Sequence, residues 1–348
     1  MELKELGKAA AAVKYDLACM PEEEKNRALL AAAEGLIRDE DRILSANAKD
    51  VADGEAKGMH PGLVDRLRLT GDRIRAMAEG LRQVSALPDP VGEVLDSFIR
   101  PNGLRIEKRR VPLGVIGIIY ESRPNVTADA FGLCFKAGNA CILKGGSDAL
   151  SSNLAISESI RTSLAECGIK PDAVQLITDT DRAVTEQFMR MNEYVDVLIP
   201  RGGAGLIRAV VEHSTVPVIE TGTGNCHIYV DEYADLAKAV PIILNAKTQR
   251  IGVCNACESL VIHEAVRERF LPVLAQALRE KHVELRGDER AQEAVPDMAK
   301  ATEKDFETEY LDYILSIKTV DSLEEAIRHI NRYSTGHSDA ILTEDKER

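Results

Sequence analysis

The sequence predicts an α/β protein with two domains. Residues 113–230 alternate short apolar runs with helical stretches, which is typical of a parallel sheet covered by helices on both faces. Residues 1–88 have helical spacing throughout, and a second α/β pattern begins beyond Asp231. With 348 residues, 45% of them hydrophobic, the chain has enough apolar material for both domains.

Composition narrows the class of partner. The net charge of −13 argues against nucleic acid or an anionic membrane, and 4% aromatic residues are too few for recognition by base stacking. The most apolar run, 114–120, is too short to cross a bilayer, and no signal peptide is visible. Seven scattered cysteines without framework spacing fit reduced thiols. We therefore expect a soluble, cytoplasmic protein.

The N-terminal region is predicted to be helical and to carry no reacting groups. One helix is expected over 22–38, after Pro21, and another from the start signal at Thr70 through residue 84. Two β-prone runs, 97–100 and 104–111, then flank an Asn-Gly turn, which indicates a hairpin. This hairpin, about 97–111, is expected to project and pair with another subunit; an ordinary surface hairpin is the alternative.

The region that follows is predicted to form the first parallel sheet. The expected strands are 114–120, 140–144, 174–178, 195–200 and 216–220, and the expected helices are 126–137, 151–167, 182–191 and 204–213. Ligands of such sheets bind beyond the carboxyl ends of the strands. Four loops at those ends, 120–125, 144–147, 201–205 and 220–225, therefore predict a nucleotide pocket.

The loop at 201–205 best fits a phosphate site, because glycines permit close approach and a helix N-terminus offers free N–H groups. Lys144 adds a cation where the ribose of a dinucleotide usually lies, which favours a 2′-phosphate, while Asp148 opposes it. The G-x-G-x-x-G fingerprint of dinucleotide-binding folds is absent from the sequence.

The second domain contains the candidate nucleophile. Helices are expected over 233–248, 264–281 and 322–331, with an apolar run at 259–263. Cys254 lies between Gly252 and Asn255 in a small-residue turn, where Arg250, with Lys247 just upstream, would favour the thiolate.

The remaining cysteines are weaker candidates. Cysteines 19, 134, 141 and 167 fall inside helical or strand patterns and are expected to be buried and inert. Cys226 follows a glycine loop, and its sequence context does not decide between an inert and a reactive thiol. Cys254 and Cys257 form a C-x-x-C pair, but no second pair or histidine cluster completes a metal site. No metal is expected.

Several motifs together resemble those of the gamma-glutamyl phosphate reductases, also called glutamate-5-semialdehyde dehydrogenases, which belong to the aldehyde dehydrogenase superfamily. The motifs are residues 111–117, 120–127, 144–146, 200–203, 220–227 and 247–250, with Cys254-Asn255. The resemblance covers essentially the whole chain. It implies an aldehyde dehydrogenase-like fold with a Rossmann-type NADPH-binding domain over 1–228, an oligomerisation hairpin, and a catalytic domain over 229–348.

The resemblance also implies an activity: NADPH-dependent reduction of L-glutamyl 5-phosphate to L-glutamate 5-semialdehyde with release of phosphate, the second step of proline biosynthesis from glutamate. Cys254 aligns with the family nucleophile and would form a thioester. Oxyanion donors would be the Cys254 N–H and a side chain of the 121–125 loop, either Arg123 or Asn125, since this loop departs from the P-W-N pattern of oxidising relatives.

The cofactor-binding set implied by the loops and the resemblance is Lys144, Gly145, Ser147, Arg201, Gly202, Gly203, Glu220 and Glu309. Glu309 resembles the superfamily's ribose-binding glutamate. Glu220 lines up with the glutamate that activates water in oxidising relatives. Because no water attacks in the reductive direction, a structural role for Glu220 is the alternative to cofactor binding.

Family members continue past Arg348, so the resemblance implies a C-terminally truncated chain, with homo-oligomers when the chain is full length and glutamate 5-kinase as a further partner. Two alternatives remain at this stage. One is an oxidising aldehyde dehydrogenase that uses water and Glu220, and the other is a non-catalytic fragment that docks on glutamate 5-kinase.

Overall fold

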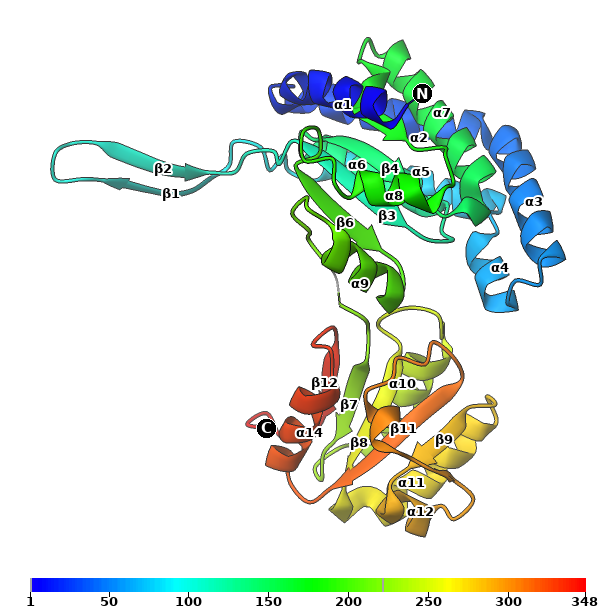
Figure 1. The fold of residues 1–348 in the computed structure, drawn as a ribbon. Coiled ribbons are helices and arrows are strands. Elements are labelled where there is room, and N and C mark those ends of the chain that lie inside the picture. Colours follow the sequence, from blue (N-terminus) through cyan, green and yellow to red (C-terminus); the bar gives the residue numbers. More distant parts are fainter. Residues whose placement is uncertain (1, 221) are drawn as a thin grey trace. The chain divides into compact units, whose positions relative to one another are not determined.

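The computed structural model describes residues 2–220 and 222–348, which form two compact units, Met1–Thr221 and Gly222–Arg348 (Figure 1). The boundary expected from the sequence, after residue 228, falls inside strand β7 (Cys226–Val230). Because β7 pairs with β8 (Cys257–His263), residues 226–228 belong to the sheet of the second unit.

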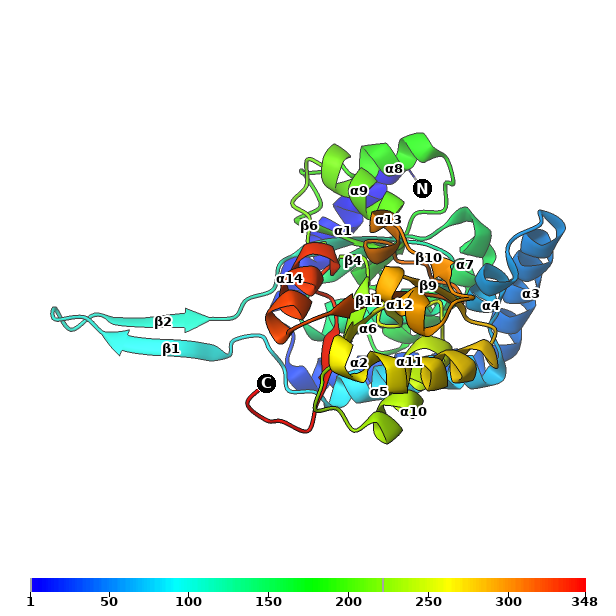
Figure 2. The same cartoon turned by 90° about the horizontal axis from the view of Figure 1, so that it is seen from below.

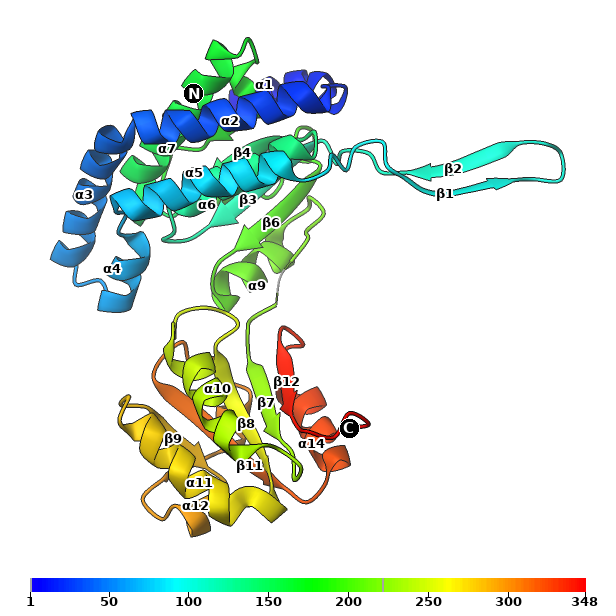
Figure 3. The ribbon, with the colours of Figure 1, turned by 180° about the vertical axis from the view of Figure 1, so that it is seen from behind.

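The first unit begins with helices, as predicted. They are α1 (Leu3–Ala18), α2 (Glu22–Arg38), α3 (Glu40–Ala56), α4 (Pro61–Leu67) and α5 (Gly71–Ala86). The bounds of α2 are those predicted, and Thr70 caps α5 by accepting a hydrogen bond from the Arg73 N–H. Helices α2 and α5 lie side by side (Figure 3). The buried Lys25 of α2 is paired with Asp89 at 2.7 Å, which fixes the start of the hairpin connection.

The predicted hairpin is present. Strands β1 (Val94–Ile99) and β2 (Arg105–Arg109) are antiparallel, and Gly103 in the turn has a φ of +84°, which favours glycine. The hairpin extends away from the helices of its unit (Figure 2). Every residue of β1 is exposed, including Phe98 and Ile99.

The sheet of the first unit has four parallel strands in the order β5-β4-β3-β6. The strands are β3 (Val115–Tyr120), β4 (Ala140–Lys144), β5 (Val174–Leu176) and β6 (Val197–Arg201); the α-helices are α6 (Asn125–Lys136), α7 (Leu150–Glu166), α8 (Arg182–Phe188) and α9 (Ala204–His213), with 3₁₀ turns at Ser147–Ala149 and Pro171–Ala173. Strands β3 and β4 are fully buried, as their apolar sequences predict.

The predicted fifth strand, 216–220, is wrong. Only Val218 makes a β-bridge, to Leu198 of β6. Pro217 accepts a hydrogen bond from the Leu198 N–H but has no N–H to donate, so the pairing does not extend into a ladder.

The second unit has a six-stranded sheet in the order β10-β9-β11-β8-β7-β12, with all pairs parallel. Its further strands are β9 (Glu284–Gly287), β10 (Ala299–Lys300), β11 (Ile314–Val320) and β12 (Asp339–Leu342), and its helices are α10 (Leu236–Thr248), α11 (Glu264–Arg279), α12 (Glu289–Ala294), α13 (Glu303–Phe306) and α14 (Leu323–Tyr333). Helix α10 starts later than predicted because Asp235 caps it. No helix in the described part of the chain is long and apolar enough to cross a membrane.

Candidate active site

The turn that contains Cys254 connects α10 to β8 and spans residues 249–256. Cys254 is exposed, whereas Cys226 and Cys257 are buried. Burial raises the pKa of each of these two thiols to about 12, so both stay protonated at neutral pH. Of the cysteines expected to be inert, Cys19 is exposed at the end of α1, contrary to the prediction. Within the second unit, the accessible thiol is therefore that of Cys254.

The backbone of Cys254 packs directly against Gly224. A Cβ atom added at Gly224 would overlap the carbonyl group of Cys254, so only glycine fits there. The Cys226 thiol donates a hydrogen bond to the same carbonyl oxygen at 3.1 Å. The Gly224 N–H in turn donates to the Glu309 carboxylate at 3.0 Å. The predicted ribose ligand Glu309 thus holds the segment on which the cysteine turn rests.

Lys247, which lies just upstream of Cys254 in the sequence, is part of a buried ion pair. Its ammonium is fully buried and paired with the fully buried Glu258 at 2.6 Å, so Lys247 does not face Cys254 as a free cation. Glu258 also accepts a hydrogen bond from the Leu311 N–H at 3.2 Å. Burial raises the pKa of Glu258 to about 7, and the Lys247 ammonium limits the rise. Arg250 is exposed.

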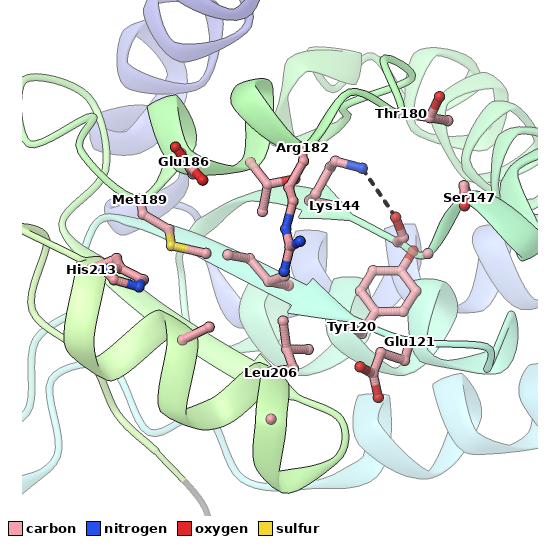
Figure 4. Close-up of a pocket in the computed structure, with 16 residues that line it drawn as sticks. Tyr120, Glu121, Lys144, Ser147, Thr180, Arg182, Glu186, Met189, Leu206 and His213 are labelled. Atoms are coloured by element: carbon pink, nitrogen blue, oxygen red, sulfur yellow. Dashed lines mark hydrogen bonds between the residues drawn. The ribbon is translucent and has the colours of Figure 1, made fainter.

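The first unit contains a pocket of about 450 Å³ beyond the carboxyl ends of β3 and β4 (Figure 4). Of the predicted cofactor ligands, Lys144, Gly145 and Ser147 line it. The Lys144 ammonium donates to the Gly145 carbonyl at 3.3 Å, and burial lowers the pKa of Lys144. A cation and a glycine turn at the end of a strand are therefore brought together as predicted.

Sequence reasoning missed one wall of this pocket. Thr180, Arg182, Thr185, Glu186 and Met189 line it from α8 and its two ends. The position of this segment in the sequence could have identified it, because it follows the carboxyl end of β5, where ligands of parallel sheets bind. Asp181 accepts a hydrogen bond from the Ala183 N–H at the start of α8.

Arg201, Gly202 and Gly203 lie at the end of β6 and before α9, whose Gly205 and Leu206 line the pocket. The N-terminus of α9 is not open, because the Glu121 carboxylate accepts a hydrogen bond from the Gly203 N–H at 2.9 Å. A phosphate at this N-terminus would compete with Glu121. Asp148, which was expected to oppose a 2′-phosphate, instead accepts a hydrogen bond from the Ser122 hydroxyl.

The two oxyanion candidates flank the start of α6. Asn125 is its first residue and donates from Nδ2 to Asp129 at 2.9 Å, while Arg123 is half-buried in the preceding turn. Glu220 is exposed near the end of the first unit. These residues and the pocket belong to the first unit, and Cys254 and Glu309 belong to the second. Among the residues that the structure describes, no three His, Cys, Asp or Glu side chains form a group suited to a metal ion.

A glycine-lined pocket at a parallel sheet in one unit and an exposed cysteine between a helix and a buried strand in the other fit the class of aldehyde dehydrogenases. The chain belongs to the aldehyde dehydrogenase family, whose model matches residues 1–303. Relatives named gamma-glutamyl phosphate reductase are 59% identical over 344 residues in Lachnospira eligens (99% of this chain, 83% of the relative) and 53% identical over 345 residues in Caldanaerobacter subterraneus subsp. tengcongensis (99% and 83%).

Solved structures agree with these relatives. A gamma-glutamyl phosphate reductase from Thermotoga maritima is 51% identical with a TM-score of 0.94, covering 100% of this chain and 84% of that one. An acetylating aldehyde dehydrogenase from Geobacillus thermoglucosidasius has a TM-score of 0.70 at 19% identity (99% of this chain, 81% of that one), which shows a shared fold alone. The protein is an oxidoreductase of this family, and the fold class and the resemblance predicted from the sequence are confirmed.

Proposed function

We propose that the protein reduces L-glutamyl 5-phosphate to L-glutamate 5-semialdehyde with release of phosphate, in the synthesis of proline from glutamate. The observation that carries this proposal is the exposed Cys254 thiol on a turn locked against Gly224. The high identity to relatives named gamma-glutamyl phosphate reductase supports the choice of substrate.

Cys254 is the proposed nucleophile. Its thiolate attacks the acyl carbon, the bond from that carbon to the phosphate oxygen breaks, and a thioester forms with inorganic phosphate as the leaving group. The Cys254 N–H and either Asn125 or Arg123 would stabilise the oxyanion. Reduction of the thioester returns Cys254 as the thiolate, so no water is needed as acceptor.

NADPH is the proposed cofactor, and the residues of the first unit fit it. The pocket of about 450 Å³ offers the Lys144 ammonium and the Arg182 guanidinium to phosphates, beside the glycine turn at Gly145. Ser147 also lines the pocket, and Arg201, Gly202 and Gly203 precede α9. Glu220 and Glu309 complete the proposed cofactor set. When bound, NADPH supplies a hydride.

The test of this function is a coupled assay in which glutamate 5-kinase, glutamate and ATP generate L-glutamyl 5-phosphate and loss of NADPH is followed by absorbance. We expect NADPH consumption that depends on the kinase, on ATP and on this protein. NADPH loss that continued without the kinase, or no loss with the complete mixture, would contradict the proposal.

Replacing Lys144 with alanine is expected to weaken NADPH binding about tenfold or more and to leave NADH binding nearly unchanged, because a charged hydrogen bond to the 2′-phosphate is lost. Fluorescence titration with both nucleotides measures this. Lys170→Ala is the matched control, since Lys170 is an exposed lysine of the same unit paired with Asp16. Equal weakening for NADH and NADPH would contradict the assignment of Lys144 to the 2′-phosphate.

Replacing Glu121 with glutamine is expected to tighten NADPH binding by about fivefold. The carboxylate now bound to the Gly203 N–H repels an incoming phosphate, and a neutral amide does not. The same titration measures the change, with Glu166→Gln as the control at the exposed end of α7. Weaker binding in Glu121→Gln would show that the carboxylate helps to bind the cofactor.

The assembly state is also a proposal. We infer a homo-oligomer formed through the β1–β2 hairpin, because Leu95, Phe98 and Ile99 are exposed on a strand with no covering element among the described residues of its unit. We further propose a cytoplasmic location and glutamate 5-kinase as a partner, since an acyl phosphate hydrolyses readily in free solution. Light scattering and co-purification with the kinase test these two points.

A further inference from the structure

The two ends of the Cys254 turn are joined by a buried ion pair. Lys247 lies in the last turn of α10 and Glu258 is the second residue of β8, so the pair brackets residues 249–256. The Lys247 ammonium and the Glu258 carboxylate are 2.6 Å apart, and neither side chain is exposed. The pair therefore closes the turn at its base.

A second connection reaches the same turn from the segment 309–311. The Leu311 N–H donates to Glu258, and Leu311 has a φ of +52°, in the region that favours glycine. Two residues earlier, Glu309 accepts from the Gly224 N–H, and Gly224 is the residue on which Cys254 packs. One short segment thus holds both the glycine beneath Cys254 and the carboxylate at the base of its turn.

Stability alone does not account for this pair. Removing two charges from water is costly, and apolar residues of similar volume are often as good or better in such positions. A direct effect of Lys247 on the nucleophile is also a poor explanation, because its ammonium is already neutralised by Glu258. The remaining explanation is that the pair fixes the positions of the two ends of the turn.

We propose that the Lys247–Glu258 ion pair, held by the Leu311 N–H, is a positioning device that keeps the turn of Cys254 in its reactive conformation. This inference rests on the proposed role of Cys254 as the nucleophile. Neither Lys247 nor Glu258 touches substrate; both act through the turn. Small displacements of a reacting group reduce turnover strongly, since about 1 Å can cost about 10²-fold.

The experiment compares Lys247→Met with Lys25→Met in the whole chain. Lys25 is a matched control, since it is also a buried lysine with a carboxylate partner at 2.7 Å, but it lies in α2 of the first unit. Each variant leaves a carboxylate without its ammonium partner, the buried Glu258 or the half-buried Asp89, so both are expected to lower the melting temperature. Only Lys247→Met is expected to raise amide hydrogen exchange over residues 249–256 and to reduce kcat ten- to hundredfold, with the Kd for NADPH unchanged.

The double variant Lys247→Met with Glu258→Met covers the case in which the single variant does not fold, because it leaves no unpaired buried charge. We expect it to regain melting temperature without regaining kcat or exchange protection. Wild-type kcat and wild-type exchange in a folded Lys247→Met or double variant would overturn the proposal. Failure of the proposed function appears differently: the unmodified protein would lack reductase turnover, while hydrogen exchange of the turn would still respond to Lys247→Met.

Discussion

Replacing Cys254 with alanine is expected to abolish reductase turnover, with a loss of at least about 10³-fold in kcat, because removal of a covalent nucleophile leaves only binding and oxyanion stabilisation. The fold should be unaffected, since the side chain is exposed on a turn. The measurement is NADPH consumption in the kinase-coupled assay, together with a melting curve for each variant.

Cys19→Ala is the control for the loss of a thiol, because Cys19 is also exposed but ends α1 in the first unit. It should retain wild-type turnover. If Cys254→Ala turned over as fast as the unmodified protein, the thioester mechanism would be wrong. If Cys19→Ala lost activity as well, the assay would not be reporting on Cys254 alone.

Gly224→Ala is expected to reduce kcat by about 10²-fold although Gly224 contributes no reacting group. The added Cβ cannot share space with the Cys254 carbonyl, so the turn must shift away, and it also loses the hydrogen bond from the Cys226 thiol. NADPH binding should change much less than kcat, because the pocket that we propose for it lies in the first unit, although the proposed cofactor residue Glu309 accepts a hydrogen bond from the Gly224 N–H. The measurements are kcat in the coupled assay and the Kd for NADPH by titration.

Gly222→Ala provides the matched control. A Cβ at Gly222 would meet only the Thr335 carbonyl at 3.9 Å, which is an ordinary contact distance. This variant should keep near-wild-type kcat. Equal losses in the two variants would mean that the whole 222–224 segment needs glycine for its flexibility and that close packing on Cys254 is not the cause.

The elements best predicted from the sequence are those with strong local signals. The buried strand Ala140–Lys144 and the helices Glu22–Arg38 and Ala204–His213 have the predicted bounds, since an apolar run marks the strand, and Pro21 and the glycines at 202–203 precede the two helices. All strands of the second unit except β8 were missed: β9 and β10 have four and two residues, β12 is a short and mostly exposed edge strand, and the apolar residues of β7 and β11 are interrupted by polar ones such as His227 and Lys318.

In the candidate site, too, the residues with a local sequence signal were predicted and those brought together by the tertiary fold were not. Lys144, Gly145 and Ser147 were found because they directly follow a predictable strand, and such loops line pockets in parallel sheets. The packing of Gly224 on Cys254 and the pairing of Lys247 with Glu258 were not predicted, because each joins residues that are brought together only by the adjacent strands β7 and β8 and the end of α10.

The most direct test of the central claim, acyl transfer between phosphate and Cys254, runs the reaction in reverse. The protein is mixed rapidly with L-glutamate 5-semialdehyde and NADP⁺, with and without inorganic phosphate, and NADPH formation is followed from the first turnover. Without phosphate we predict a burst of one NADPH per Cys254 that then stops, because the thioester has no acceptor, and with phosphate we predict continued turnover. Continued turnover at the same rate without phosphate, with glutamate as the product, would contradict the claim and indicate an oxidising enzyme that uses water.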